Sequence, residues 1–100
     1  MNIEKIVDNE TVTLKPEGWL DAANSPALGE AIEAVESAKE IILDLDDVEY
    51  IASTGVRQIV LLYRKGQELG AATKVINARK EVYSILKLTG IDKKIEIAEK

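Results

Sequence analysis

The chain alternates short apolar segments with longer amphipathic ones, and this alternation constrains its fold more than any other feature. Residues 41–45 read Ile-Ile-Leu-Asp-Leu and are nearly all apolar, which predicts a central strand covered on much of both faces. Shorter strands are predicted at residues 3–7, 11–15, 73–76 and 94–98. The first two of these flank turn-forming residues, so we expect them to form a hairpin.

Three amphipathic helices are predicted between these strands. The first begins at residues 24–26, Asn-Ser-Pro, where a capping side chain precedes a proline of the first turn. The second ends at Gly70, a residue type suited to the left-handed position that follows a helix. The third is expected to have Asn77 as its cap and to stop at Gly90.

The resulting order is strand, strand, helix, strand, helix, strand, helix, strand. We therefore predict one α/β domain over residues 1–100, with a small mixed sheet made of the N-terminal hairpin and mostly parallel strands. We interpret residues 46–51 as a loop that leads into the second helix. Arg64 and Lys65 lie in the later part of that helix and are expected to complement the negative end of its dipole.

The composition excludes several classes of protein. The chain has no cysteine, no histidine, no carboxylate cluster with metal-ligand spacing and no glycine-rich phosphate loop, so we expect no disulfide, no metal site, no thiol nucleophile and no cofactor. Its formal net charge of -5 disfavours nucleic acid and anionic lipid as partners. We expect no signal peptide and no membrane insertion, because the longest apolar stretch, residues 59–63, is far too short to span a bilayer. The default expectation is a cytoplasmic protein that is monomeric when free.

The most informative position for chemistry is the start of the second helix. Ser53 and Thr54 lie there, followed by Gly55, beyond the carboxyl end of the central strand, where the ligands and partners of α/β sheets gather. Free backbone N–H groups and the positive end of the helix dipole would tolerate a phosphate on either hydroxyl. Such a phosphate would strengthen the acidic field of the nearby Asp46, Asp47 and Glu49, which suits a switch that acts on a partner.

Two other interpretations of Ser53 remain open. A serine or threonine before a helix is commonly no more than an N-cap. A serine hydroxyl can also be the nucleophile of a hydrolytic enzyme, but this chain has no histidine to activate it, and Lys65 lies three turns further along the helix. The hydrolase interpretation therefore lacks the general base that it requires.

Residues 18–21, which read Gly-Trp-Leu-Asp, form a second unusual stretch. Leu20 is expected in the core, whereas Asp21 either stays exposed or caps the turn at Asn24. Trp19 is the only tryptophan of the chain. It is either an aromatic lid on the edge of the core or an exposed anchor for a partner.

Taken together, these segments resemble the STAS domain family. Residues 18–21 and 24–28 are similar to its G-x-L-D…T-x-P-x-L opening, and residues 42–57 to its I-L-D-L…V-x-x-I-[DS]-S-[STA]-G-[VL] signature. Residues 75–77 and 82–91 match its closing strand, helix and L-T-G-[IL] segment. The resemblance covers nearly the whole chain, and its motifs occur in the expected order and at the expected spacing.

The resemblance implies a sheet with about three helices packed mainly on one side. It also implies an anti-sigma factor antagonist, which when unphosphorylated binds an anti-sigma factor with a GHKL-type serine kinase fold and so releases a sigma factor. The kinase would phosphorylate Ser53 with ATP and end the complex, and a PP2C-type phosphatase would reverse this. The partner-binding residues expected on this basis are Trp19, Asp21, Ser53, Thr54, Gly55 and Arg57.

One departure from the family pattern leaves an alternative open. The residue before the phosphorylated serine is often Asp in the family, and here it is Ala52. Thr54 is the second candidate acceptor. If no kinase modifies the chain, it would instead be a constitutive STAS interaction module, such as a subunit of a lipid transporter or of a sensory scaffold complex.

Overall fold

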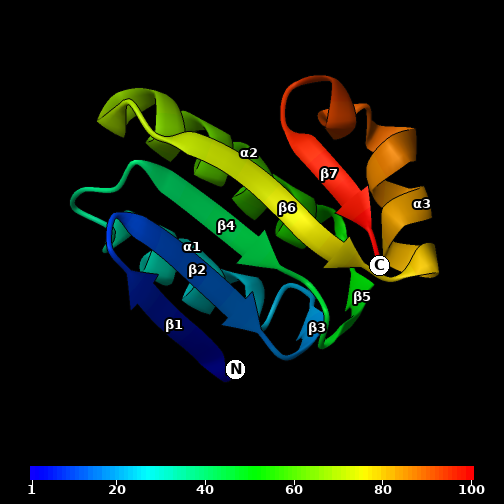
Figure 1. Cartoon of the computed structure of the whole chain (residues 1–100). Coiled ribbons are helices and arrows are strands. Elements are labelled where there is room, and N and C mark those ends of the chain that lie inside the picture. The colour runs from blue at the N-terminus through cyan, green and yellow to red at the C-terminus, as the bar shows by residue number, and fades with distance from the viewer.

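The computed structural model describes all of residues 1–100 and contains a five-stranded sheet of order β1-β2-β4-β6-β7 (Figure 1). A two-stranded sheet of β3 and β5 lies beyond the carboxyl ends of β2 and β4. The elements in chain order are β1 (Ile3–Asp8), β2 (Thr11–Pro16), β3 (Gly18–Leu20), α1 (Ser25–Glu33), β4 (Glu40–Asp44), β5 (Val48–Ile51), α2 (Ser53–Leu69), β6 (Ala72–Ala78), α3 (Lys80–Thr89), the 3₁₀-helix η1 (Ile91–Lys93) and β7 (Glu96–Glu99).

The main sheet has the predicted topology. β1 and β2 form an antiparallel hairpin, and β2, β4, β6 and β7 run parallel to one another. Helices α1 and α2 lie behind the sheet in Figure 1, and α3 packs beside β5, β7 and η1. The α/β class, the mixed sheet and the placement of the helices mainly on one side are therefore confirmed.

The two-stranded sheet is absent from the sequence prediction, and the interpretation of residues 46–51 as a loop is wrong for Val48–Ile51. These four residues form β5, which pairs in parallel with β3. Gly18 opens β3 with a φ of +100°, which residues with a side chain rarely adopt, so the chain can turn sharply after β2. Strands of three or four residues that pair with a distant segment are too short to show a recognisable period.

The core lies between the main sheet and the helices α1 and α2. Its fully buried side chains include Leu14, Leu28, Ile32, Ile41, Leu43, Ile59 and Leu62. The prediction that the strand at residues 41–45 is covered on both faces is wrong, because no helix lies over the front face of the sheet (Figure 1). Ile42 points to this open face, where it is half-buried between Thr13 and Lys74 of the neighbouring strands.

Three of the four predicted helix ends lie at the predicted residue. Asn24 is the N-cap position of α1, but the prediction that its side chain caps this helix is wrong, because it makes no capping hydrogen bond. Gly70 and Gly90 end α2 and α3 in the left-handed conformation, with φ of 69° and 78°. Asn77, by contrast, does not cap α3. It belongs to β6, has a φ of 58°, and donates from its side chain to Asp44 Oδ1 on the adjacent strand (3.1 Å). The N-cap of α3 is Arg79, which lacks a side-chain hydrogen bond to the helix.

The prediction that Arg64 and Lys65 complement the end of their own helix is wrong, because α2 continues to Leu69. Lys65 is buried, and its Nζ donates to the backbone oxygen of Glu33 at the end of α1 (3.1 Å). The last carbonyl groups of a helix have no partner within it and carry its negative dipole end. Lys65 therefore joins α2 to the carboxyl end of α1.

Candidate functional site

The connection between β5 and α2 carries the candidate phosphorylation site. Ala52 forms this connection: its N–H donates to the backbone oxygen of Leu20 (2.9 Å), and its own oxygen accepts from the N–H groups of Gly55 and Val56 (2.9 and 3.0 Å). Ala52 is the N-cap of α2, and Ser53 is the exposed first helical residue. The interpretation of Ser53 as a helix cap is therefore wrong, and no side chain caps this helix.

The two candidate hydroxyl groups differ in their surroundings. Thr54 is half-buried, and its Oγ1 accepts from Ser25 Oγ at 3.5 Å, the long limit of a hydrogen bond. Ser25 itself is fully buried at the start of α1. A kinase must bring the acceptor oxygen in line with the phosphate of ATP, which requires free access to the hydroxyl. The exposure of Ser53 meets this requirement better than the packing of Thr54 does.

Gly55 determines where α2 begins. It is buried, and a Cβ atom there would lie 2.7 Å from Ile51 Cγ1 and 2.8 Å from the backbone oxygen of Leu20. The helix therefore packs directly on the two-stranded sheet at a distance that only glycine permits. Because it is buried, Gly55 positions Ser53 and presents no surface of its own to a partner.

Trp19 and Tyr50 form an exposed aromatic pair on the two-stranded sheet. They lie opposite each other in β3 and β5, with ring centroids 5.4 Å apart and ring planes tilted by 52°, as in attractive aromatic pairs. Trp19 is 54% exposed and Tyr50 is 43% exposed, so Trp19 is not a lid on the core. Sequence analysis missed Tyr50 because its strand was not predicted. The sequence feature that could have indicated Tyr50 is its position three residues before Ser53.

Asp21 caps the turn into α1, one of the two roles expected for it. Its Oδ1 accepts from the N–H of Asn24 at 3.0 Å, and its backbone oxygen accepts from the N–H of Ser25 at 2.8 Å. Asn24 Nδ2 in turn donates to the backbone oxygen of Trp19 (3.1 Å). One turn therefore fixes both the backbone of Trp19 and the start of α1.

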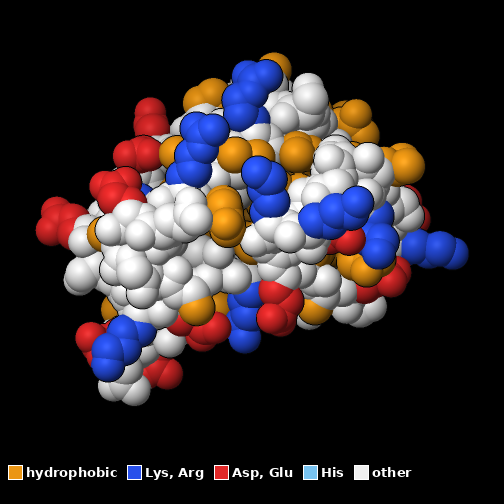
Figure 2. Space-filling view, turned by 90° about the horizontal axis from the view of Figure 1, so that it is seen from above, with side chains coloured by type: hydrophobic (Ala, Val, Ile, Leu, Met, Phe, Trp, Pro, Cys, Tyr) orange, Lys and Arg blue, Asp and Glu red, His pale blue; other side chains and the backbone are white.

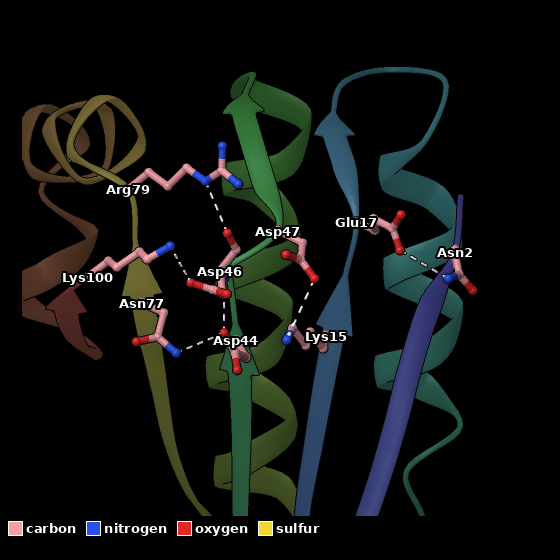
Figure 3. Close-up of polar contacts among 9 residues, drawn as sticks. All are labelled: Asn2, Lys15, Glu17, Asp44, Asp46, Asp47, Asn77, Arg79 and Lys100. Atoms are coloured by element: carbon pink, nitrogen blue, oxygen red, sulfur yellow. Dashed lines mark hydrogen bonds and ion pairs between the residues drawn. The ribbon is translucent and has the colours of Figure 1, made fainter.

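Aspartates beyond the carboxyl end of β4 form a polar cluster with side chains from neighbouring elements (Figure 3). Asp46 Oδ1 lies 2.8 Å from Lys100 Nζ, and Asp47 Oδ2 lies 3.6 Å from Lys15 Nζ. These carboxylates are thus paired with cations. They add less negative field at Ser53 than their place in the sequence indicates.

The ion pairs shift the pKa of two members of this cluster. The hydrogen bond from Lys100 lowers the pKa of the Asp46 carboxyl, and the charge of Asp47 raises the pKa of Lys15. Asp46 therefore contributes stability at pH values above its ordinary pKa of 3.8. This contribution is lost as the pH falls through the lower pKa of the folded state. Lys15 contributes stability at pH values below its ordinary pKa of 10.5. This contribution is lost as the pH rises through the raised pKa of the folded state.

The stability of the Asp46→Asn variant should fall less at acidic pH than that of the wild type. Because Asn does not titrate, we expect its urea unfolding midpoint to fall less than that of the wild type between neutral pH and a pH well below 3.8, although the difference is small for an exposed pair. Glu49→Gln is the matched control, because Glu49 is exposed and lies outside the ion pairs of the structure. The same acid dependence in both variants would show that the Asp46–Lys100 pair contributes nothing to stability.

A hollow lies on the outward side of α2. Its lining residues are Arg57, Gln58, Val60, Leu61 and Arg64. Arg57 is exposed and follows Ser53 by four residues, so the two side chains are neighbours on one face of the helix. Arg57, predicted to bind a partner, therefore shares a surface with the candidate phosphorylation site.

In the chain, Ser53 follows Tyr50 by three residues, is adjacent to Thr54 and precedes Arg57 by four, so aromatic, hydroxyl and guanidinium groups flank it. No group of three or more His, Cys, Asp or Glu side chains is placed to hold a metal ion. No helix combines the length and the apolar character needed to cross a bilayer.

Comparison with known proteins finds one family and several similar structures. A family model described as STAS domain matches residues 2–100. An anti-sigma factor antagonist from Mycobacterium paratuberculosis is 28% identical, with a TM-score of 0.87 over 99% of this chain and 86% of that one. The Bacillus cell fate determinant SpoIIAA in its phosphorylated form is 17% identical, with a TM-score of 0.74 over 99% and 93%. A sulfate transporter family protein from Wolinella succinogenes is 16% identical, with a TM-score of 0.81 over 95% and 81%.

Proposed function

The chain belongs to the STAS domain family, and we propose that it is an anti-sigma factor antagonist whose binding is switched by phosphorylation at Ser53. The observation that carries this proposal is the position of Ser53, an exposed hydroxyl on the first residue of α2, where no side chain caps the helix. The description of the similar mycobacterial protein as an anti-sigma factor antagonist supports the same role.

In its unphosphorylated form the protein contacts an anti-sigma factor and so releases a sigma factor. The contact uses what we call the switch surface, defined by the exposed side chains of Trp19, Tyr50, Ser53 and Arg57. Aromatic and arginine side chains contribute a large share of the binding energy at protein interfaces. Asp21 and Thr54, which were also predicted to bind a partner, are half-buried, and Gly55 is buried.

A phosphate on Ser53 suits a change in binding better than a change in folding. The first N–H groups of α2 have no side-chain partner, and the positive end of the helix dipole favours an anion there. The helix would therefore tolerate the phosphate, whereas its charge of about -1.5 to -2 would face the partner. Like charges brought together in an interface cost several kcal/mol, which is enough to end the complex.

The proposal includes the enzymes that set the switch. The anti-sigma factor has a GHKL-type serine kinase fold and transfers the terminal phosphate of ATP to Ser53 Oγ, and a PP2C-type phosphatase hydrolyses the phosphoserine. The protein itself is a cytoplasmic binding partner, monomeric when free, and not an enzyme. Because Ala52 supplies no carboxylate before the acceptor, recognition by the kinase depends on the rest of the switch surface.

Mapping the phosphate tests the choice of acceptor. Incubating the purified chain with ATP and a lysate of its source organism should add one phosphate, which mass spectrometry locates on Ser53. Ser53→Ala should stay unmodified. Thr54→Val should still be modified, because valine keeps the shape of threonine and removes only the hydroxyl. If Ser53→Ala is modified at Thr54, Thr54 is the acceptor. If the wild type stays unmodified, the proposal of a phosphorylation switch is wrong.

A constitutive STAS interaction module is the second candidate function, favoured by Ala52 and by the similar fold of a sulfate transporter family protein. Pull-downs with wild type, Ser53→Ala and Ser53→Asp as baits distinguish the two. A GHKL-type kinase captured by wild type and Ser53→Ala, but not by Ser53→Asp, supports the switch. A transport ATPase or a sensor protein captured equally by all three supports the module.

A further inference from the structure

The outward side of α2 carries two arginines on either side of an apolar patch. Arg57 and Arg64 are exposed and lie two helical turns apart, which places them about 10.5 Å from each other along the helix axis. Val60 and Leu61 lie between them, half-buried, and line the hollow described above. These four residues are called the α2 hollow from here on.

The arginines of the α2 hollow have no acidic partner within the chain. The ion pairs of the structure use lysines only, namely Lys15, Lys39, Lys74, Lys87 and Lys100. Acidic residues outnumber basic ones in this chain, so a shortage of carboxylates does not explain why Arg57 and Arg64 are unpaired. Seen from above, several basic side chains lie among hydrophobic ones in the upper and central part of the view, and acidic side chains lie at the left, lower and right parts (Figure 2).

We propose that the α2 hollow binds an acidic amphipathic helix of the partner protein. Guanidinium groups pair with carboxylates through two parallel N–H···O hydrogen bonds, and Val60 and Leu61 offer an apolar contact between the two pairs. A helix with acidic residues seven positions apart and apolar residues at the third and fourth positions between them has the matching spacing. This inference rests on the proposed function, because the α2 hollow lies on the helix that begins with Ser53.

The position of Ser53 gives a mechanism by which phosphorylation acts on this surface. Ser53 precedes Arg57 by four residues, the spacing at which helical side chains are neighbours. A phosphate on Ser53 would therefore lie beside Arg57, where it competes with the carboxylate of the partner for that guanidinium group and also repels the carboxylate. Arg64 lies two turns beyond Arg57, so the phosphate leaves it available.

Two synthetic helical peptides serve as probes for the test. One carries two glutamates seven residues apart with two leucines between them, and in the other the glutamates are replaced by lysines. Binding to the full chain is followed through amide chemical shifts in ¹⁵N NMR spectra, at low and at high salt. We expect the glutamate peptide to shift the resonances of residues 57–64 and to bind about tenfold more tightly than the lysine peptide, with an advantage that decreases as salt is added.

Charge variants separate the α2 hollow from the rest of the surface. Arg57→Gln/Arg64→Gln should weaken binding of the glutamate peptide about tenfold, and Arg57→Glu/Arg64→Glu should prefer the lysine peptide. The matched control is Lys80→Gln/Lys94→Gln, which changes the net charge equally at two exposed lysines outside the ion pairs. This control should bind like the wild type. Thermal unfolding of each variant establishes that it is folded.

Three results would overturn the inference: no binding of the glutamate peptide, equal affinity for both peptides, or equal losses in the arginine and lysine variants. The peptide assay contains no kinase, so its outcome is independent of the switch. If the glutamate peptide binds but the partner binds Ser53→Asp as well as the wild type, the inference about the α2 hollow is supported and the phosphorylation switch is contradicted. Failure of the peptide together with an intact Ser53 effect would remove the hollow and keep the switch.

Discussion

Replacing Ser53 by Asp is expected to weaken binding of the anti-sigma factor by about 100-fold, as like charges within an interface cost several kcal/mol and each ~1.4 kcal/mol is tenfold in affinity. The side chain of Ser53 is exposed at the start of α2, so the new carboxylate faces the partner. The variant should unfold at no lower temperature than the wild type, because a negative charge at a helix start is favourable. Titration calorimetry with the purified partner measures the affinity.

Two controls show whether charge at this position is the cause. Ser53→Asn has nearly the size of Ser53→Asp without its charge and should bind within a few-fold of the wild type. Ser84→Asp adds the same charge at an exposed position of α3 and should have no effect. A loss in Ser53→Asn as large as that in Ser53→Asp would mean that shape, and not charge, ends the complex. A loss in Ser84→Asp would mean that net charge alone matters.

Replacing Gly55 by Ala should destabilise the fold by about 1–3 kcal/mol through overpacking. The added Cβ would lie 2.8 Å from the backbone oxygen of Leu20 and 2.7 Å from Ile51 Cγ1. That oxygen accepts the hydrogen bond from Ala52 N–H, so it cannot move without separating β3 from the start of α2. The loss should appear as a lower urea midpoint with an unchanged slope, and binding should weaken because Ser53 is displaced.

Gly29→Ala is the matched control for Gly55→Ala. Both substitutions replace a helical glycine by alanine. Alanine by itself favours the helix over glycine by about 1 kcal/mol. The Cβ at position 29 would approach Gln58 Oε1, at 2.6 Å, the end of a flexible side chain that can rotate away. We therefore expect little change or a small gain in stability for Gly29→Ala. Equal losses in the two variants would contradict the assignment of Gly55 as the residue that sets the start of α2.

Local patterns predict the main sheet and the helix ends because the interactions involved act within a few residues of the chain. The alternation at residues 11–15 reflects one buried face of β2, on which Val12 and Leu14 lie. Gly70 and Gly90 end their helices because glycine adopts the left-handed conformation at little cost. These features would be much the same in any fold that contained the same segments.

Contacts between distant segments could not be predicted in this way. Trp19 meets Tyr50 only because β3 pairs with β5, and Lys65 reaches the end of α1 only because α1 and α2 lie side by side. Asn77 is an example in which the local pattern led to a wrong prediction. Its sequence neighbourhood indicates a helix cap, but its hydrogen-bond partner is Asp44 on the adjacent strand.

At the candidate site, the sequence by itself determined the available chemistry. The adjacent hydroxyls of Ser53 and Thr54, and the lack of a histidine to activate either, follow from the residues alone. Which hydroxyl is free was decided only by the tertiary structure. Packing of α1 brings Ser25 beside Thr54, and the contacts of Ala52 and Gly55 with β3 set the start and the rotation of α2. A helix turns its side chains outward or inward according to what it packs against, and that neighbour comes from another part of the chain.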